Sequence, residues 1–71
     1  MQTGTVSINP PESRLDGTFL AICGSPNPFG AATAFLQNKG ISDGDRITVT
    51  GTAGQIGNVP VICMTDATPA A

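Results

Sequence analysis

Residues 46–64, RITVTGTAGQIGNVPVICM, decide the fold because they contain two strand patterns with a turn between them. Isoleucine and valine alternate with threonine in residues 46–50, a period of two that is typical of a strand with one buried face. Residues 59–64 form a second apolar run. Gly57 and Asn58 both accept positive φ, so they predict a tight two-residue turn. The stretch therefore predicts an antiparallel hairpin.

The two-residue turn fixes the pairing of these strands. Ile56 would pair with Val59, and Gly54 with Val61. Val61 then shares a face with Ile56, opposite to the apolar residues of the first strand. Either both faces of the hairpin are covered, or one extra residue brings the apolar side chains to the same side. We expect a bulge or a strong bend at Gly51 or Gly54.

The glycine-rich segment GTAGQIG, residues 51–57, also has the composition of a phosphate-binding loop. Such a loop opens a helix whose N-terminal amides hold the anion, whereas here a strand follows and no lysine occurs after Lys39. We therefore interpret the glycines as hairpin geometry. Asp43 and Asp45 flank a glycine, but the twelve-residue calcium loop with its final glutamate is absent, so this segment predicts a turn.

The N-terminal third predicts two further strands. Residues 4–8, GTVSI, alternate, and residues 17–23, GTFLAIC, form a nearly unbroken apolar run. A run covered on both faces indicates a strand near the middle of a barrel, with a helix or loop over its outer side. Residues 9–17, NPPESRLDG, predict a loop, because two prolines cannot donate hydrogen bonds within a sheet.

Residues 31–41, AATAFLQNKGI, fit a helix better than a strand. Alanine, leucine, glutamine and lysine are good helix formers. Asn27 can cap the start, with Pro28 at the first helical position. Gly40 can take the left-handed conformation that ends a helix, and Ile41 can pack back against the last turn.

Together these elements predict a mainly β (α+β) fold. We expect a small OB-like or SH3-like β-barrel of four to five antiparallel strands with one short helix around residues 29–39. Residues 1–71 form one domain, in which residues 67–71 are expected to be a disordered tail.

The segment GISDGDRITVTGTAGQIGNVPVICMTD, residues 40–66, resembles the closing half of a small bacterial OB-fold-like barrel domain. In such domains a helix leads into a strand with the pattern GD-x-I-x-V-x-G, followed by a hairpin and a final apolar strand. The resemblance covers residues 31–66. It implies a binding face formed by Arg46, Thr48, Thr50 and exposed residues of the second predicted strand of the chain, residues 17–23. It also implies a role in binding nucleic acid.

The charge of the chain argues against strong nucleic-acid binding. Charged residues make up 11% of the chain, against about 25% in typical domains, and the net charge is −2. The three basic residues are dispersed, and phosphate binding depends on lysine and arginine. We predict a binding or assembly module for a protein partner or a second copy, with weak OB-type binding of single-stranded nucleic acid or oligosaccharide as the alternative. The candidate binding residues are Arg14, Phe29, Arg46, Thr48 and Thr50.

The chain contains no histidine and no serine with a catalytic partner, so we predict that it is not an enzyme and needs no cofactor or metal. Cys23 and Cys63 are interpreted as two buried thiols, with a disulfide as the alternative. We see no membrane-spanning or signal segment. The cytoplasm is the expected location, although a mature secreted chain would look the same.

Overall fold

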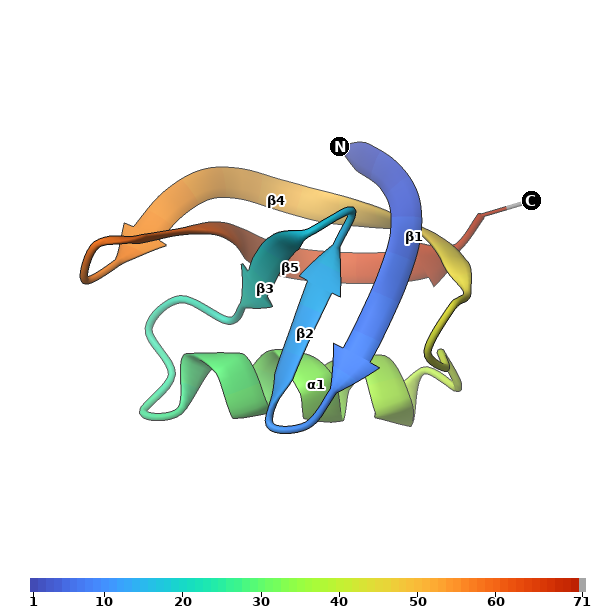
Figure 1. The fold of residues 1–71 in the computed structure, drawn as a ribbon, viewed down its shortest axis with the longest axis horizontal. Coiled ribbons are helices and arrows are strands. Elements are labelled where there is room, and N and C mark those ends of the chain that lie inside the picture. Colours follow the sequence, from blue (N-terminus) through green and yellow to red (C-terminus); the bar gives the residue numbers. More distant parts are fainter. Residues whose placement is uncertain (71) are drawn as a thin grey trace.

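The backbone forms a five-stranded closed barrel with one helix, and the computed structural model describes residues 1–70 (Figure 1). The elements are β1 (Gln2–Asn9), β2 (Glu12–Leu15), β3 (Thr18–Ala21), α1 (Pro28–Asn38), β4 (Arg46–Ile56) and β5 (Val59–Pro69). The order around the barrel is β1-β2-β3-β5-β4, and β4 pairs again with β1. All neighbouring strands are antiparallel except β3 and β5, which are parallel.

This architecture confirms the mainly β barrel with one short helix. The expectation of purely antiparallel strands is wrong for β3 and β5. A parallel pair needs a long crossover connection, and here α1 and β4 lie between the two strands in the chain. The topology is compatible with an OB-like barrel.

The β4–β5 hairpin has the predicted turn and register. Ile56 pairs with Val59, and the register shifts where Gly51 follows Thr50 on β4. Thr65 of β5 is the extra residue, because Thr50 pairs with Asp66 and Gly51 pairs with Met64. The bulge therefore lies at Gly51, on the β5 side of the pair. Thr65 donates a side-chain hydrogen bond of 3.0 Å to the carbonyl oxygen of Thr50. The predicted bulge at Gly51 is therefore confirmed.

The bulge changes which residues of β5 face the barrel interior. Ala67 is 1% exposed and Asp66 points to solvent. Without the extra residue, alternation from Met64 would point Asp66 into the barrel and Ala67 to solvent. Both faces of the hairpin are also partly covered, because Val61 is buried on the outer side while Met64 and Ile62 belong to the core.

The predicted loop at residues 9–17 is wrong, because residues 12–15 form β2 between β1 and β3. The strand is short, and both prolines lie in the turn before it, where no ladder hydrogen bond is required. Ser13 and Leu15 face inward and are buried. A four-residue strand with one inward serine carries too little apolar periodicity to be recognised locally.

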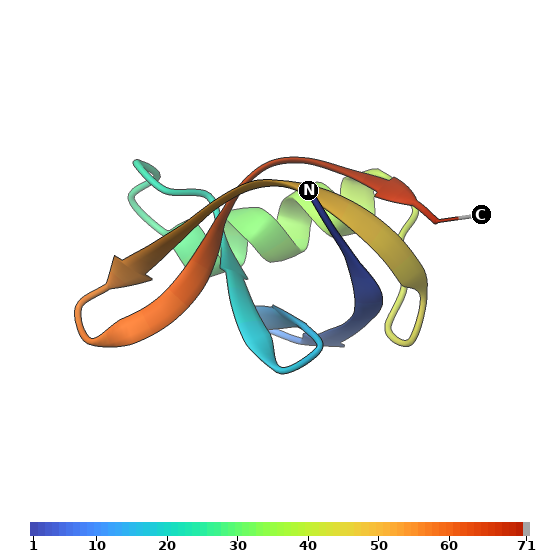
Figure 2. The ribbon, with the colours of Figure 1, turned by 90° about the horizontal axis from the view of Figure 1, so that it is seen from above.

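The helix α1 closes one end of the barrel (Figures 1 and 2). It begins at Pro28, and the side chain of the predicted N-cap residue Asn27 accepts a hydrogen bond from the Gly30 amide. At its end Gly40 has φ +78°, and the amides of Gly40 and Ile41 donate to carbonyl oxygens of the last turn. This is a Schellman arrangement, and Ile41 packs into the core as predicted.

The core fills the space between the strands and α1. Among residues 1–70 the buried polar side chains are those of Ser13 and Thr33, whose hydroxyl oxygens lie 2.6 Å apart. Thr33 donates its only hydroxyl hydrogen to the Pro11 carbonyl oxygen at 3.0 Å, so Ser13 must donate to Thr33. The buried apolar cluster consists of Val6, Leu15, Leu20, Ala32, Leu36, Ile41, Ile47, Val49, Ile62, Met64 and Ala67.

The C-terminal residues differ from the expected disordered tail at 67–71. Residues 67–69 belong to β5, and the Ala70 amide donates to the Arg46 carbonyl oxygen at 2.9 Å. Burial of Ala67 explains why this segment pairs with β4. Residue 71 lies outside the described residues.

Candidate functional site

Three side chains from neighbouring strands form a row on the outer face of the barrel. Ser7 of β1 is opposite Arg14 of β2, and Arg14 is opposite Phe19 of β3. Their chain neighbours Leu15 and Leu20 point into the core. Because side chains alternate across a strand, Arg14 and Phe19 must point outward.

Arg14 and Phe29 both contact Phe19 on this face, and we call the three residues the Arg14–Phe19–Phe29 cluster. The guanidinium carbon of Arg14 lies 4.4 Å from the centroid of the Phe19 ring. The rings of Phe19 and Phe29 are 5.6 Å apart and meet edge to face at 66°. Phe29 comes from the first turn of α1, so three elements hold the cluster. A cation–π contact at an exposed site contributes about 0.5–1 kcal/mol, enough to orient Arg14 over the ring.

The cluster remains accessible to a partner. Arg14 is exposed, and both phenylalanines are half-buried. Beside Arg14 lies a recess of about 170 Å³ lined by Ser7, Asn9, Glu12 and Arg14. This volume is below the roughly 300 Å³ at which small-ligand pockets begin, so the recess suits one polar group of a larger partner.

The other predicted binding residues lie elsewhere on the barrel. Arg46, Thr48 and Thr50 are on β4, which β1 separates from β2. The hydroxyl oxygen of Thr48 is 2.9 Å from that of Thr3 on β1. The structure therefore brings Arg14 and Phe29 together and leaves the three β4 residues as a separate surface.

Phe19 is the member of the cluster that the sequence did not predict. The apolar run at residues 17–23 indicated only that both faces of this strand are covered. The signal that identifies its environment is Arg14 on the adjacent strand, and that strand was not predicted.

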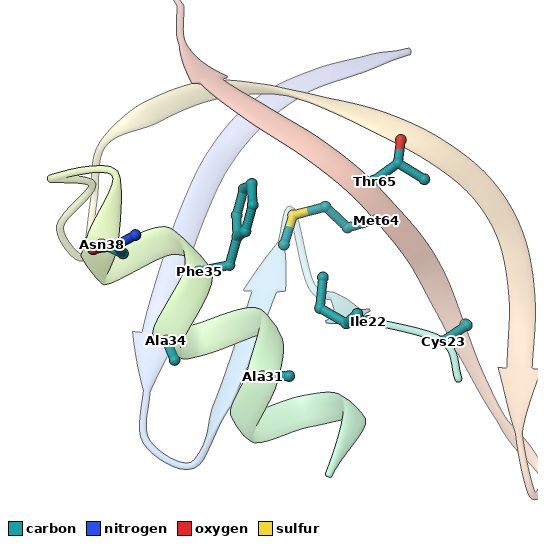
Figure 3. A pocket seen from close by; sticks show the side chains of 8 residues that line it. All are labelled: Ile22, Cys23, Ala31, Ala34, Phe35, Asn38, Met64 and Thr65. Carbon is teal, nitrogen blue, oxygen red and sulfur yellow. The ribbon is translucent and has the colours of Figure 1, made fainter. Parts of the chain in front are cut away.

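A second surface is an open groove between α1 and β5, which we call the α1–β5 groove (Figure 3). Side chains of α1 and β5 face each other across it, and Phe35 and Met64 point toward its centre. At one end Lys39 forms an ion pair of 3.3 Å with Asp66, and its amino group lies 5.5 Å from the Phe35 ring centroid. The lining residues are Ile22, Cys23, Ala31, Ala34, Phe35, Asn38, Met64 and Thr65.

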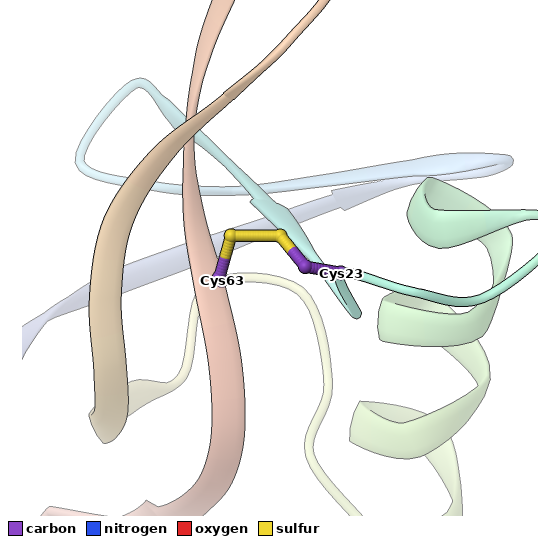
Figure 4. Close-up of a disulfide and its surroundings, with 2 residues drawn as sticks. All are labelled: Cys23 and Cys63. Atoms are coloured by element: carbon purple, nitrogen blue, oxygen red, sulfur yellow. A yellow bond between two sulfur atoms is a disulfide. The ribbon is translucent and has the colours of Figure 1, made fainter.

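Cys23 and Cys63 form a disulfide (Figure 4), so the interpretation as two buried thiols is wrong. Their Cα atoms are 5.2 Å apart. Cys63 lies opposite Ala21 in the parallel β3–β5 pair, and the chain turns after Ala21 so that Cys23 reaches Cys63. The parallel pairing that creates this proximity has no local sequence signal.

The aspartate side chains in the turns accept hydrogen bonds from backbone amides. Asp16 accepts from the Thr5 amide at 3.1 Å, and Asp43 accepts from the Ile8 amide at 2.8 Å. Asp45 accepts from an amide within its own turn. Within residues 1–70 no group of three or more histidine, cysteine, aspartate or glutamate side chains is placed to hold a metal ion. The Asp45 amide donates to the Ser42 carbonyl oxygen at 3.1 Å, which confirms the predicted turn at residues 42–45.

The only helix in residues 1–70 has 11 residues, and none there is both long and apolar enough to span a membrane. Comparison of the chain with protein-family models, with curated proteins and with solved structures found no match.

Proposed function

We propose that this protein is a non-enzymatic binding module and that the Arg14–Phe19–Phe29 cluster is the centre of its binding face. The observation that carries the proposal is the contact of the exposed Arg14 guanidinium with the half-buried Phe19 ring, which in turn packs edge to face against Phe29. Arginine and aromatic residues, phenylalanine among them, are enriched in the cores of protein interfaces. Their attachment to β2, β3 and α1 also limits the entropy lost on binding.

A protein segment is the partner that this face fits best. Arg14 is the one cation in the cluster, and the chain as a whole has a net charge of −2. Affinity for a phosphate backbone requires several cations on one face. A peptide needs only an apolar contact on the rings and a carboxylate or carbonyl group opposite Arg14.

Single-stranded nucleic acid or oligosaccharide is the second candidate. OB-fold barrels bind such ligands on the outer face of strands 2 and 3, which is the position of Arg14 and Phe19. The Arg14 guanidinium lies over the Phe19 ring, and its own planar face can stack on a base. The polar recess lined by Ser7, Asn9 and Glu12 could accept ligand hydroxyl groups.

The disulfide bears on the cellular location. Disulfides persist in oxidising compartments and are rare in the cytosol. We therefore propose an oxidising compartment, in place of the expected cytoplasmic location.

Peptides selected from a random library on the native protein test the proposal. We expect Phe19→Ala and Arg14→Gln to weaken binding at least tenfold, which corresponds to about 1.4 kcal/mol. Thr48→Ala on β4 is the matched control, since it changes an outer side chain away from the cluster, and it should bind as the native protein does. Circular dichroism should show that all three variants fold.

The outcomes separate the two candidates. Peptide binding that is unchanged in Phe19→Ala would refute the proposed face. So would an NMR titration with the peptide in which the backbone amide shifts that change lie on β4. Labelled single-stranded oligonucleotides and oligosaccharides should give no anisotropy change at low salt if the partner is a protein. Binding of either ligand, lost in Phe19→Ala, would favour the second candidate.

A further inference from the structure

The two sulfur atoms of the disulfide have different surroundings. Cys23 is exposed in the loop after β3, whereas Cys63 is half-buried within β5. Cys63 has a strand on each side, because it pairs with Ala21 of β3 and with Thr52 of β4. An external reagent therefore meets Cys23 first.

β4 also packs directly against the sulfur of Cys63. A Cβ atom added at Gly54 would lie 2.7 Å from Cys63 Sγ, so the β4 backbone and this sulfur are in close contact. β4 passes on the side of Cys63 that faces away from Cys23 (Figure 4). A thiolate must approach a disulfide sulfur in line with the sulfur–sulfur bond. β4 therefore hinders an approach to Cys63 from the side opposite Cys23.

We propose that Cys23 is a modification site that forms a mixed disulfide with an external thiol. The thiolate attacks Cys23 Sγ and forms a new sulfur–sulfur bond. The bond between Cys23 and Cys63 breaks, and its electron pair leaves on Cys63 Sγ, which takes a proton from water. The exchange needs no other oxidant or reductant, because one disulfide replaces another.

The α1–β5 groove determines which thiols react. Cys23 is part of its lining, together with the apolar side chains of Ile22, Ala34, Phe35 and Met64. A thiol whose aromatic or aliphatic body lies in the groove holds its sulfur beside Cys23 (Figures 3 and 4). The site therefore takes thiols with an apolar body in preference to small polar ones. This inference is independent of the Arg14–Phe19–Phe29 cluster.

The position of the adduct tests the choice of sulfur. The oxidised native protein is treated briefly with 2-phenylethanethiol, free thiols are alkylated with iodoacetamide, and the chain is digested with trypsin. Cleavage after Arg14, Lys39 and Arg46 places Cys23 and Cys63 in separate peptides. We expect the phenylethyl group on Cys23 and the alkyl group on Cys63. An equal or larger share of the phenylethyl group on Cys63 would overturn the proposal.

Variants of α1 test the role of the groove. Rates per thiolate are compared for 2-phenylethanethiol and 2-mercaptoethanol, and the native protein should prefer the aromatic thiol about tenfold, as expected for burial of part of a ring. Ala34→Asp places a charge in the groove and should reduce that preference severalfold. Gln37→Asp adds the same charge on the exposed face of α1 outside the groove and should preserve it. The groove has no such role if the native protein shows no preference, or if Ala34→Asp retains it.

Discussion

Gly51→Ala should destabilise the protein because the β4–β5 bulge brings two backbones together at this residue. An added Cβ would collide with the carbonyl oxygen of Cys63 and lie 3.0 Å from both the Cys63 carbonyl carbon and the Met64 Cα. All three are backbone atoms, so relief requires β5 to move away from β4. Gly51 does not have positive φ, and alanine can adopt its conformation. The cost is therefore steric.

The expected size follows from two opposing terms. Overpacking typically costs about 1–3 kcal/mol, and contacts with backbone favour the upper part of that range. Replacing glycine in a strand recovers roughly 0.5–1 kcal/mol of chain entropy. We expect Gly51→Ala to lower the free energy of unfolding by about 1–2 kcal/mol and the Tm by roughly 4–16 °C, at about 4–8 °C for each kcal/mol.

Urea unfolding without reductant, followed by far-ultraviolet circular dichroism, measures this change, since the chain has no tryptophan or tyrosine to report by fluorescence. Thr52→Ala is the control, because this exposed neighbour on β4 should change stability by less than about 0.5 kcal/mol. A Gly51→Ala variant as stable as the native protein would show that the two strands do not approach as described.

Three further predictions concern other parts of the barrel. Gly40→Val should lower the free energy of unfolding in urea by about 1 kcal/mol or more, because φ is +78°. An added Cβ meets no atom within 4 Å, so this cost is backbone strain and not a collision; a neutral result would contradict the helix cap. Thr33→Val should cost about 1–3 kcal/mol by leaving Ser13 and the Pro11 carbonyl without their partner; a double-mutant cycle with Ser13→Ala should show coupling, and simple additivity would argue against the hydrogen-bonded chain. Reduction of the disulfide should cost about 4 kcal/mol, since its cysteines are 40 residues apart in sequence and it constrains a long loop in the unfolded chain; equal stability with and without reductant would contradict that constraint.

The features predicted from the sequence are those with local signals. The hairpin turn, its register and the bulge near Gly51 follow from glycine positions and alternation within residues 46–64. The helix follows from its capping residues. Each of these signals lies within a few residues of the feature that it specifies.

The features that were missed depend on neighbours distant in the chain. β2 is four residues long, and its place is set by the strands on either side. Without β2 there is no reason to place Phe19 beside Arg14, so only Arg14 and Phe29 of the cluster were predicted. The disulfide depends on the parallel pairing of β3 and β5, which involves residues 19–21 and 61–63.

The number of free thiols in unfolded protein that has never been reduced tests the disulfide most directly. The barrel joins β5 to the loop after β3 through Cys23 and Cys63, and both the stability and the proposed modification depend on that bond. We predict close to zero free thiols per chain before reduction and close to two after it. Close to two free thiols before reduction would contradict the disulfide and the chemistry assigned to Cys23.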